Sequence, residues 1–184
     1  MKRRTMLRNL MQARLRSTQS TSECGTSVDK EWVMVVFERT KSPLSELDIK
    51  RVESRLGIRL PHDLREHYLR HNGGIPHPQF FPKDGDAYEV RNFLPMNIED
   101  PIGLTFEDAY VSMVDQTPED PQGYIPFAID PAGDMFLYSV RPESFGNIMF
   151  ISHEDYQDPD RYIVFFAPTL EQFINSLTEL PEGL

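Results

Sequence analysis

The 184-residue chain is poor in cysteine, in long apolar runs and in motifs that bind phosphates or metals. Its single cysteine, Cys24, cannot form a disulfide within one chain, which favours a reducing compartment and predicts a cytoplasmic location. No apolar stretch approaches the roughly 18 residues of a membrane-spanning helix. Walker-type glycine loops, HExxH pairs and cysteine-rich zinc spacings are missing, so the sequence predicts no metal and no other cofactor.

Positive charge is also scarce, and it is unevenly distributed. The first 22 residues contain six Lys or Arg and no acid, whereas residues 31–184 contain 12 basic and 27 acidic residues, a net charge of −15. A domain with this charge repels the phosphate backbone of nucleic acids and attracts basic proteins. We therefore expect a basic protein as partner, and neither nucleic acid nor membrane.

Residues 1–30 differ in composition from the rest of the chain. Apolar side chains recur at helical spacing among arginines between Met6 and Leu15, and a Ser/Thr-rich stretch follows. Three interpretations stay open: a targeting presequence, a frayed helix, or a segment upstream of the true translation start. The sequence predicts a flexible basic extension over residues 1–30 and one folded domain over residues 31–184.

Two adjacent helices are well signalled near the start of the domain. Ser45 is a candidate N-cap, Asp48 stands at the third position of a capping box, and Gly57 follows as the end of the helix. The next helix is expected to have Pro61 as its first residue and to end at Asn72–Gly74, where glycines allow the left-handed backbone of a helix terminus.

The remaining pattern predicts strands joined by hairpins, with two more helices. Consecutive hairpin-linked strands indicate an α+β fold, with a mostly antiparallel sheet of about five to six strands packed with about four helices. The predicted strands cover residues 32–37, 88–96, 146–152 and 161–167, and a hairpin covers 124–140; a proline-rich loop precedes residue 88, and helices begin at Thr105 and Thr169.

Four of the five histidines lie between residues 62 and 77, which raises the question of a metal site. At about 100° per residue, His67 and His71 fall on the apolar side of the second helix, and His62 points nearly opposite to them. Three histidines of this helix therefore cannot share one metal ion. We expect His67 and His71 to line a buried or half-buried face as structural residues.

Two groups of residues have the composition of catalytic sites. Asp130 and Asp134 flank the predicted hairpin turn and could bind a cation or exchange protons, but no third ligand or base is evident nearby. Turn chemistry is favoured instead, with an Asx-type hydrogen bond at Asp130 and a solvated Asp134. Residues 152–155, Ser-His-Glu-Asp, are of the types found in catalytic triads. Neighbouring residues along a strand point to opposite faces, so these residues cannot form a triad with one another. We therefore expect no catalytic residues and no enzyme.

Four segments in order resemble one known family. They are "LSELDIKRVESRLGIRLPHDLREHYLRHNGGIP", "IPFAIDPAGDMFLYS", "GNIMFISHE" and "FFAPTLEQFINSL". Together they resemble SUKH-superfamily domains of the Smi/Knr type over residues 32–179, although that family often has an aromatic residue where this chain has His67. The resemblance implies a bacterial immunity protein that binds and neutralises the toxin of a polymorphic or contact-dependent toxin system, often a nuclease. The alternative that it implies is a non-catalytic regulatory scaffold that binds other cellular proteins.

An acidic stretch is the best candidate for the partner-binding surface. Between Arg91 and Arg141 there is no Lys, Arg or His, and there are nine carboxylates. A solvated surface that serves only solubility explains this pattern equally well. Tyr110 and Tyr124 are candidate affinity anchors, provided that their rings are exposed. The acidic candidates are Glu99, Asp100, Asp115, Glu119, Asp120, Asp130, Asp134, Glu154 and Asp155.

Overall fold

The computed structural model describes residues 34–96, 103–116, 122–155, 158 and 162–180. In these ranges the chain forms four α-helices, one short 3-10 turn and nine strands. The helical elements are α1 (Glu46–Leu56), α2 (His62–Arg70), α3 (Phe106–Gln116), η1 (Pro142–Ser144) and α5 (Leu170–Asn175). The strands are β1 (Val36–Glu38), β2 (Ile75–His77), β3 (Phe80–Lys83), β4 (Asp86–Glu89), β5 (Asn92–Phe93), β6 (Tyr124–Ile129), β7 (Met135–Ser139), β8 (Ile148–Ile151) and β9 (Ile163–Ala167).

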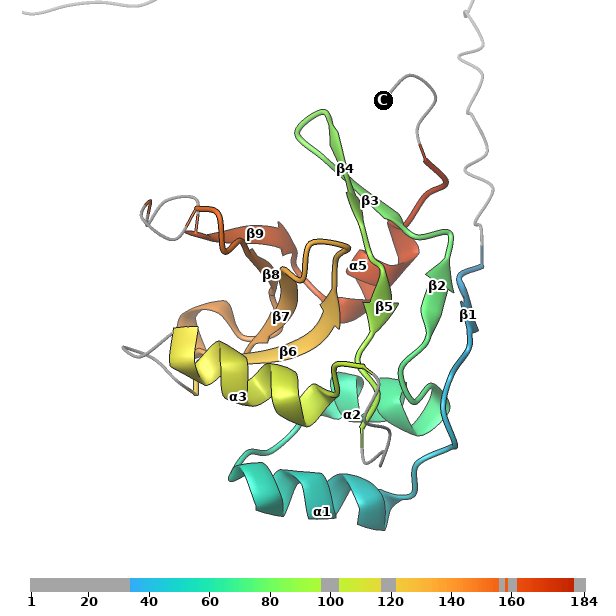
Figure 1. Cartoon of the computed structure of the whole chain (residues 1–184), viewed down its shortest axis with the longest axis vertical. Coiled ribbons are helices and arrows are strands. Elements are labelled where there is room, and N and C mark those ends of the chain that lie inside the picture. The colour runs from blue at the N-terminus through green and yellow to red at the C-terminus, as the bar shows by residue number, and fades with distance from the viewer. Residues whose placement is uncertain (1–33, 97–102, 117–121, 156–157, 159–161, 181–184) are drawn as a thin grey trace, which may run out of the picture. The chain divides into compact units, whose positions relative to one another are not determined.

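An antiparallel sheet forms the centre of the fold. Its five strands lie in chain order, β5-β6-β7-β8-β9, and β1-β2 and β3-β4 form two further two-stranded antiparallel sheets. In Figure 1, α3 runs along β6, while α1 and α2 lie together at the bottom of the view. The α+β class, the mostly antiparallel sheet and the number of helices are confirmed.

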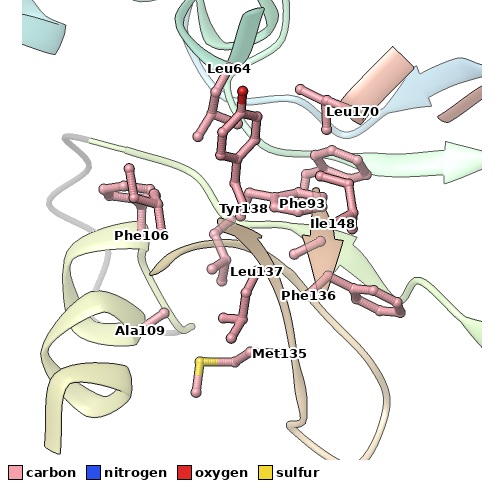
Figure 2. Close-up of a cluster of buried hydrophobic side chains, with 14 of the residues drawn as sticks. Leu64, Phe93, Phe106, Ala109, Met135, Phe136, Leu137, Tyr138, Ile148 and Leu170 are labelled. Atoms are coloured by element: carbon pink, nitrogen blue, oxygen red, sulfur yellow. The ribbon is translucent and has the colours of Figure 1, made fainter. Parts of the chain in front are cut away.

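Both faces of the central sheet are covered by helices. All five residues of β7 are buried, and the first four, Met135 to Tyr138, form a continuous apolar or aromatic run rather than an alternating pattern. Figure 2 shows Met135 on the side of Ala109 from α3, whereas the ring of Tyr138 extends toward Leu64 of α2. On the side of α5, Phe136 packs against Phe173 with ring centroids 5.2 Å apart.

Two expectations about the first strands are wrong. The proline-rich segment is not a loop, because β2 and β3 lie in it and pair with β1 and β4. The single strand expected over 88–96 is two strands in different sheets. The chain changes partners between them: Val90 donates its backbone hydrogen bond to Gln79, and Arg91 donates to Ile129 across the central sheet.

Three of the four predicted helix starts are confirmed by their hydrogen bonds. Ser45 and Asp48 form a complete capping box at α1, and the Thr169 hydroxyl accepts a hydrogen bond from the backbone N–H of Gln172 at α5. At α3, the Thr105 hydroxyl accepts from the backbone N–H of Asp108 at 3.1 Å. Helix α2 begins one residue later than expected, because Pro61 occupies the cap position and not the first helical turn.

The residues that follow α2 form a buried junction, in which the Asn72 side chain is 3% exposed. Its amide nitrogen donates to the carbonyls of Ser42 (3.0 Å) and Met96 (3.2 Å), and its oxygen accepts from the Met96 N–H at 2.8 Å. Gly73 and Gly74 follow with φ of 69° and 110°, and a Cβ on Gly74 would lie 2.8 Å from the carbonyl oxygen of Glu38. The Asn-Gly-Gly sequence therefore holds three segments of chain together.

Candidate partner-binding surface

The turn between β6 and β7 is organised by Asp130. One carboxylate oxygen of this residue accepts hydrogen bonds from the backbone N–H groups of Gly133 and Asp134, both at 2.8 Å. The Asp134 carbonyl in turn accepts from the Asp130 N–H at 3.0 Å. The Asx-type hydrogen bonding predicted for Asp130 is confirmed.

Asp134, in contrast, is not the solvated carboxylate that we expected. It is 8% exposed, and one carboxylate oxygen accepts from the backbone N–H of His153 at 3.0 Å and forms an ion pair with the Nδ1 atom of the same residue. The cause lies in the sheet register: Met135, the next residue, pairs with Ile151 of β8, which brings the segment after β8 alongside the turn. Sequence spacing alone cannot show this contact.

Asp130, Asp134, His153 and Glu154 form a group that we call the hairpin-end cluster. The hydrogen bond to Asp134 raises the pKa of His153, as do the charges of Asp134, Glu154 and Asp130. Burial, followed by the nearby Asp134 charge, raises the pKa of Asp130 above its ordinary value despite its backbone hydrogen bonds. The imidazole therefore compensates part of a concentrated negative charge.

His153 should make protein stability depend on pH. Its pKa is raised on folding, so its ion pair stabilises the fold fully below the ordinary value of 6.5, and this stabilisation is lost as pH rises through the folded-state pKa. Replacing His153 by glutamine should therefore reduce the free energy of unfolding more at pH 6 than at pH 9. Urea denaturation at several pH values measures the difference.

The matched control for that experiment is His62→Gln, at an exposed histidine of α2. A difference between wild type and His153→Gln that stays constant from pH 6 to pH 9 would contradict the role assigned to the ion pair.

Helix α3 presents a second acidic surface. Asp108, Val111 and Asp115 follow one another at helical spacing and are exposed, and Val111 is 55% exposed. Asp115 lies in the last turn, which holds no basic residue, although the helix dipole disfavours a carboxylate there. We call these three residues the α3 outer face. An exposed apolar side chain between carboxylates suits contact with a basic partner.

The two tyrosines proposed as anchors do not meet the condition of exposure. Tyr110 is 5% exposed and Tyr124 is 6% exposed. The Tyr124 hydroxyl accepts a hydrogen bond from Arg141 at 3.1 Å, and burial raises the pKa of Tyr110. Tyr110 lies on the inner side of α3, one residue before the exposed Val111. Both tyrosines pack inside the domain, so they do not meet the condition for affinity anchors.

Two of the other acidic candidates lie in the described ranges, and four lie outside them. Glu154 is exposed and Asp155 is half-buried. The candidates outside the described residues are Glu99, Asp100, Glu119 and Asp120.

His67 and His71 occupy the positions that the helical projection predicts. His67 is 6% exposed, His71 is half-buried, and His62 is exposed. Burial lowers the pKa of His67 to about 3, and the positive charges of His71 and Arg70 act in the same direction. Both rings pack on Phe37, with centroid distances of 5.1 and 4.7 Å. The burial of His67 and the half-burial of His71, which the helical projection predicts, are confirmed.

A groove between α2 and α5 was missed from the sequence. Asp63, Glu66 and His67 line one side, and Glu171 and Ile174 line the other. The residues that α2 contributes recur three and four positions apart, so the sequence does show that they share one side of this helix. Nothing in the sequence pairs that side with a helix about a hundred residues later. The described residues contain no group of three His, Cys, Asp or Glu that could hold a metal ion, and none of their helices is long and apolar enough to cross a membrane.

Comparison with known proteins gives one family. The family described as SMI1 / KNR4 (SUKH-1) matches residues 43–176, from the residue before Leu44 to Ser176, the C-cap residue of α5. The matched range includes the hairpin-end cluster, the α3 outer face and the groove. No curated protein matches the chain.

Proposed function

Because the chain belongs to the SMI1/KNR4 family (SUKH-1), we propose that it is an immunity protein that binds and neutralises a cognate toxin of nuclease type. The proposal includes a cytoplasmic location and the absence of catalytic activity. The toxin would belong to a polymorphic or contact-dependent system and would carry a basic surface, as proteins that bind nucleic acids do.

The separation of charge within the domain is the observation that supports this proposal most. Between Glu46 and Arg70, which spans α1 and α2, six basic residues balance five acidic ones. Between residues 92 and 140, which include α3, β6 and β7, there are nine carboxylates and no Lys, Arg or His. Negative charge is therefore concentrated in one segment of the chain and is not spread evenly along it, as it could be if it served solubility alone.

This arrangement suits inhibition by competition. The hairpin-end cluster and the α3 outer face would attract the basic surface with which a nuclease binds its substrate. Once bound, the acidic surface would occupy the place of the nucleic acid phosphates. No chemical step by the immunity protein is required, since binding alone blocks the toxin.

Co-purification from native cells tests the function directly. We expect the tightest partner to be a basic protein whose nuclease activity falls in proportion to the amount of this protein added, reaching full inhibition at one equivalent. A tight partner without toxic or nuclease activity would contradict the proposal and favour the regulatory alternative.

Charge reversal should change the rate at which the partner is bound. In the double variant Asp115→Lys, Glu154→Lys the association rate should fall by about tenfold at low salt, because electrostatic steering depends on the summed field. Salt dependence of the association rate should become weaker, and the dissociation rate should change less. Stopped-flow kinetics at several salt concentrations measures all three quantities.

A control with the same change in net charge is Asp86→Lys, Glu179→Lys, at exposed carboxylates of β4 and the C-terminal segment. If both double variants slow association equally, the effect comes from net charge, and the candidate surface has no special role.

A further inference from the structure

Strand β9 lies at the edge of the central sheet but has the composition of an interior strand. It pairs with β8 on one side, and no segment of the described residues pairs with it on the other. The opposite edge of the sheet, at β5, is joined by Gly74, which pairs with Phe93. Natural proteins protect open edges with charged residues, proline or a covering element. The sequence of β9, Ile-Val-Phe-Phe-Ala, has no charge and no proline, which suits a strand with neighbours on both sides.

The backbone groups of Ile163 and Phe165 point toward this open edge. The Tyr162 carbonyl accepts a hydrogen bond at 3.0 Å from the N–H of Ser152, the residue after β8. The N–H and C=O groups of an antiparallel strand point alternately to its two sides, so those of Ile163 and Phe165 point away from β8. Beyond Phe165 the pairing with β8 is irregular. The regular part of the edge therefore presents two residues at the spacing of an antiparallel ladder.

The side chains of β9 are fully packed on only one face of the sheet. Phe166 is 6% exposed, and its ring centroid lies 5.2 Å from that of Phe81 and 4.8 Å from that of Tyr88. Phe165 points to the other face and is 46% exposed, and Ile163 on the same face is half-buried. One exposed apolar side chain is ordinary on a protein surface. Here it lies beside unpaired backbone groups, so one partner would satisfy both.

Charge identifies a second copy of this chain as that partner. A basic toxin is attracted by carboxylates, and β9 has none. Residues 31–184 contain 12 basic and 27 acidic residues, a net charge of −15, so two copies repel one another over most of their surface. They can approach closely where an uncharged element faces its own equivalent. A two-fold axis meets this condition, because it places the same strand on both sides of the contact.

We propose that β9 pairs antiparallel with β9 of a second copy, across a two-fold axis at Val164, so that the two central sheets join into one. In this register Ile163 of each copy lies opposite the partner's Phe165, and the two residues exchange both of their backbone hydrogen bonds. The Ile163 side chain of each copy then covers the exposed ring of the partner's Phe165, as an aliphatic–aromatic pair across the strands.

This pairing leaves the candidate partner-binding surface of α3 free. Helix α3 runs along β6, and β7 and β8 separate β6 from β9 in the sheet (Figure 1). Each copy therefore keeps its own α3 outer face. The inference goes beyond the proposed function and does not depend on it.

Analytical ultracentrifugation of the full chain tests whether the pair forms. We expect reversible association to twice the 21.4 kDa mass of one chain, with a Kd on the order of 10 μM, since a contact of this size belongs to the weak specific interfaces. Phe165→Lys should raise this Kd by at least about tenfold, because it replaces the apolar cover by a charge at the strand edge. Phe145→Lys makes the same change at a phenylalanine that is 61% exposed, and it should leave the Kd unchanged.

A cysteine cross-link tests the register. In a Cys24→Ser background, Val164→Cys should form an intermolecular disulfide under mild oxidation, because position 164 faces its own equivalent. The Cα atoms of such a directly opposed pair lie about 4.5 Å apart, within the range of disulfides. Phe165→Cys in the same background should react at least about fivefold more slowly, since the two equivalent positions are diagonal neighbours about 7–8 Å apart. Random collision would favour the more exposed position 165 instead.

The proposal is overturned if the chain keeps the mass of one copy at concentrations about tenfold above the expected Kd. It is also overturned if Phe145→Lys weakens association as much as Phe165→Lys, or if Phe165→Cys cross-links as fast as Val164→Cys. Open-ended aggregates in place of a pair would overturn it as well, because pairing across a two-fold axis uses up the free edge of β9. All of these measurements use this chain alone, so their outcome is separate from that of the toxin experiments.

Discussion

Replacing Asn72 by alanine is expected to lower the free energy of unfolding by about 3 kcal/mol. The substitution removes three hydrogen bonds and leaves the buried N–H of Met96 without its acceptor. Each lost bond costs little when water can replace it, but a buried group cannot be hydrated, and its full desolvation penalty remains. Urea denaturation of the purified variant measures the loss.

Asn92→Ala is the matched control for this prediction. Asn92 is half-buried and donates one hydrogen bond, at 3.1 Å, to the carbonyl of Phe93, so its removal should cost about 1 kcal/mol. Equal losses in the two variants would show that the junction after α2 is not held by the Asn72 side chain.

Replacing His67 by phenylalanine is expected to raise the free energy of unfolding by about 1–3 kcal/mol at pH 7. The ring lies among Phe37, Tyr68 and Phe93, with centroids 4.8 Å apart for the His67–Phe93 pair, and phenylalanine would remove the unpartnered Nε2 from these apolar surroundings. The imidazole ring of histidine and the phenyl ring of phenylalanine are close enough in size for the packing around position 67 to be retained.

The gain from His67→Phe should grow as the pH falls. The folded-state pKa of His67, about 3, lies below the ordinary value of 6.5. Below pH 6.5 the His67 imidazole therefore becomes protonated in the unfolded wild-type chain but stays neutral in the folded chain, which favours unfolding. Wild type should lose up to about 1.4 kcal/mol per pH unit relative to the variant, or about 2 kcal/mol by pH 5. Thermal or urea unfolding at pH 7, 6 and 5 gives this difference.

His71→Phe serves as the control, because His71 is half-buried and the lowering of its pKa should produce a smaller dependence on pH. A stability difference between wild type and His67→Phe that does not change between pH 7 and pH 5 would contradict the neutral state of His67.

Local signals in the sequence predicted those parts of the fold that depend on neighbouring residues. Ser45, Thr105 and Thr169 start helices because a side-chain oxygen reaches a backbone N–H two or three residues later, and this geometry needs no tertiary information. The Asp130 turn was predicted for the same reason. Helical periodicity likewise placed His67 and His71 on the apolar side of α2.

Features that depend on distant residues could not be predicted in this way. The contact of Asp134 with His153 and the burial of Tyr124 both arise from strand register in the central sheet. The β3-β4 hairpin does not follow from the sequence pattern, because Pro82 and the two prolines before it obscure the alternation of a strand, although Asp84-Gly85 at its tip is a hairpin signal. The groove between α2 and α5 requires two helices from opposite ends of the domain.

The pairing of Phe80 with Thr178 has a consequence for synthesis on the ribosome. Their backbones exchange two hydrogen bonds, and the partners are 98 residues apart in the chain. The central sheet can assemble strand by strand as it emerges, because its spatial order is its chain order. At translation rates of about 5–20 residues per second, Thr178 is synthesised roughly 5–20 s after Phe80, and β3 lacks this partner until then. Over that interval an apolar strand edge is open to other nascent chains, and a chain cut short before Thr178 would never close it.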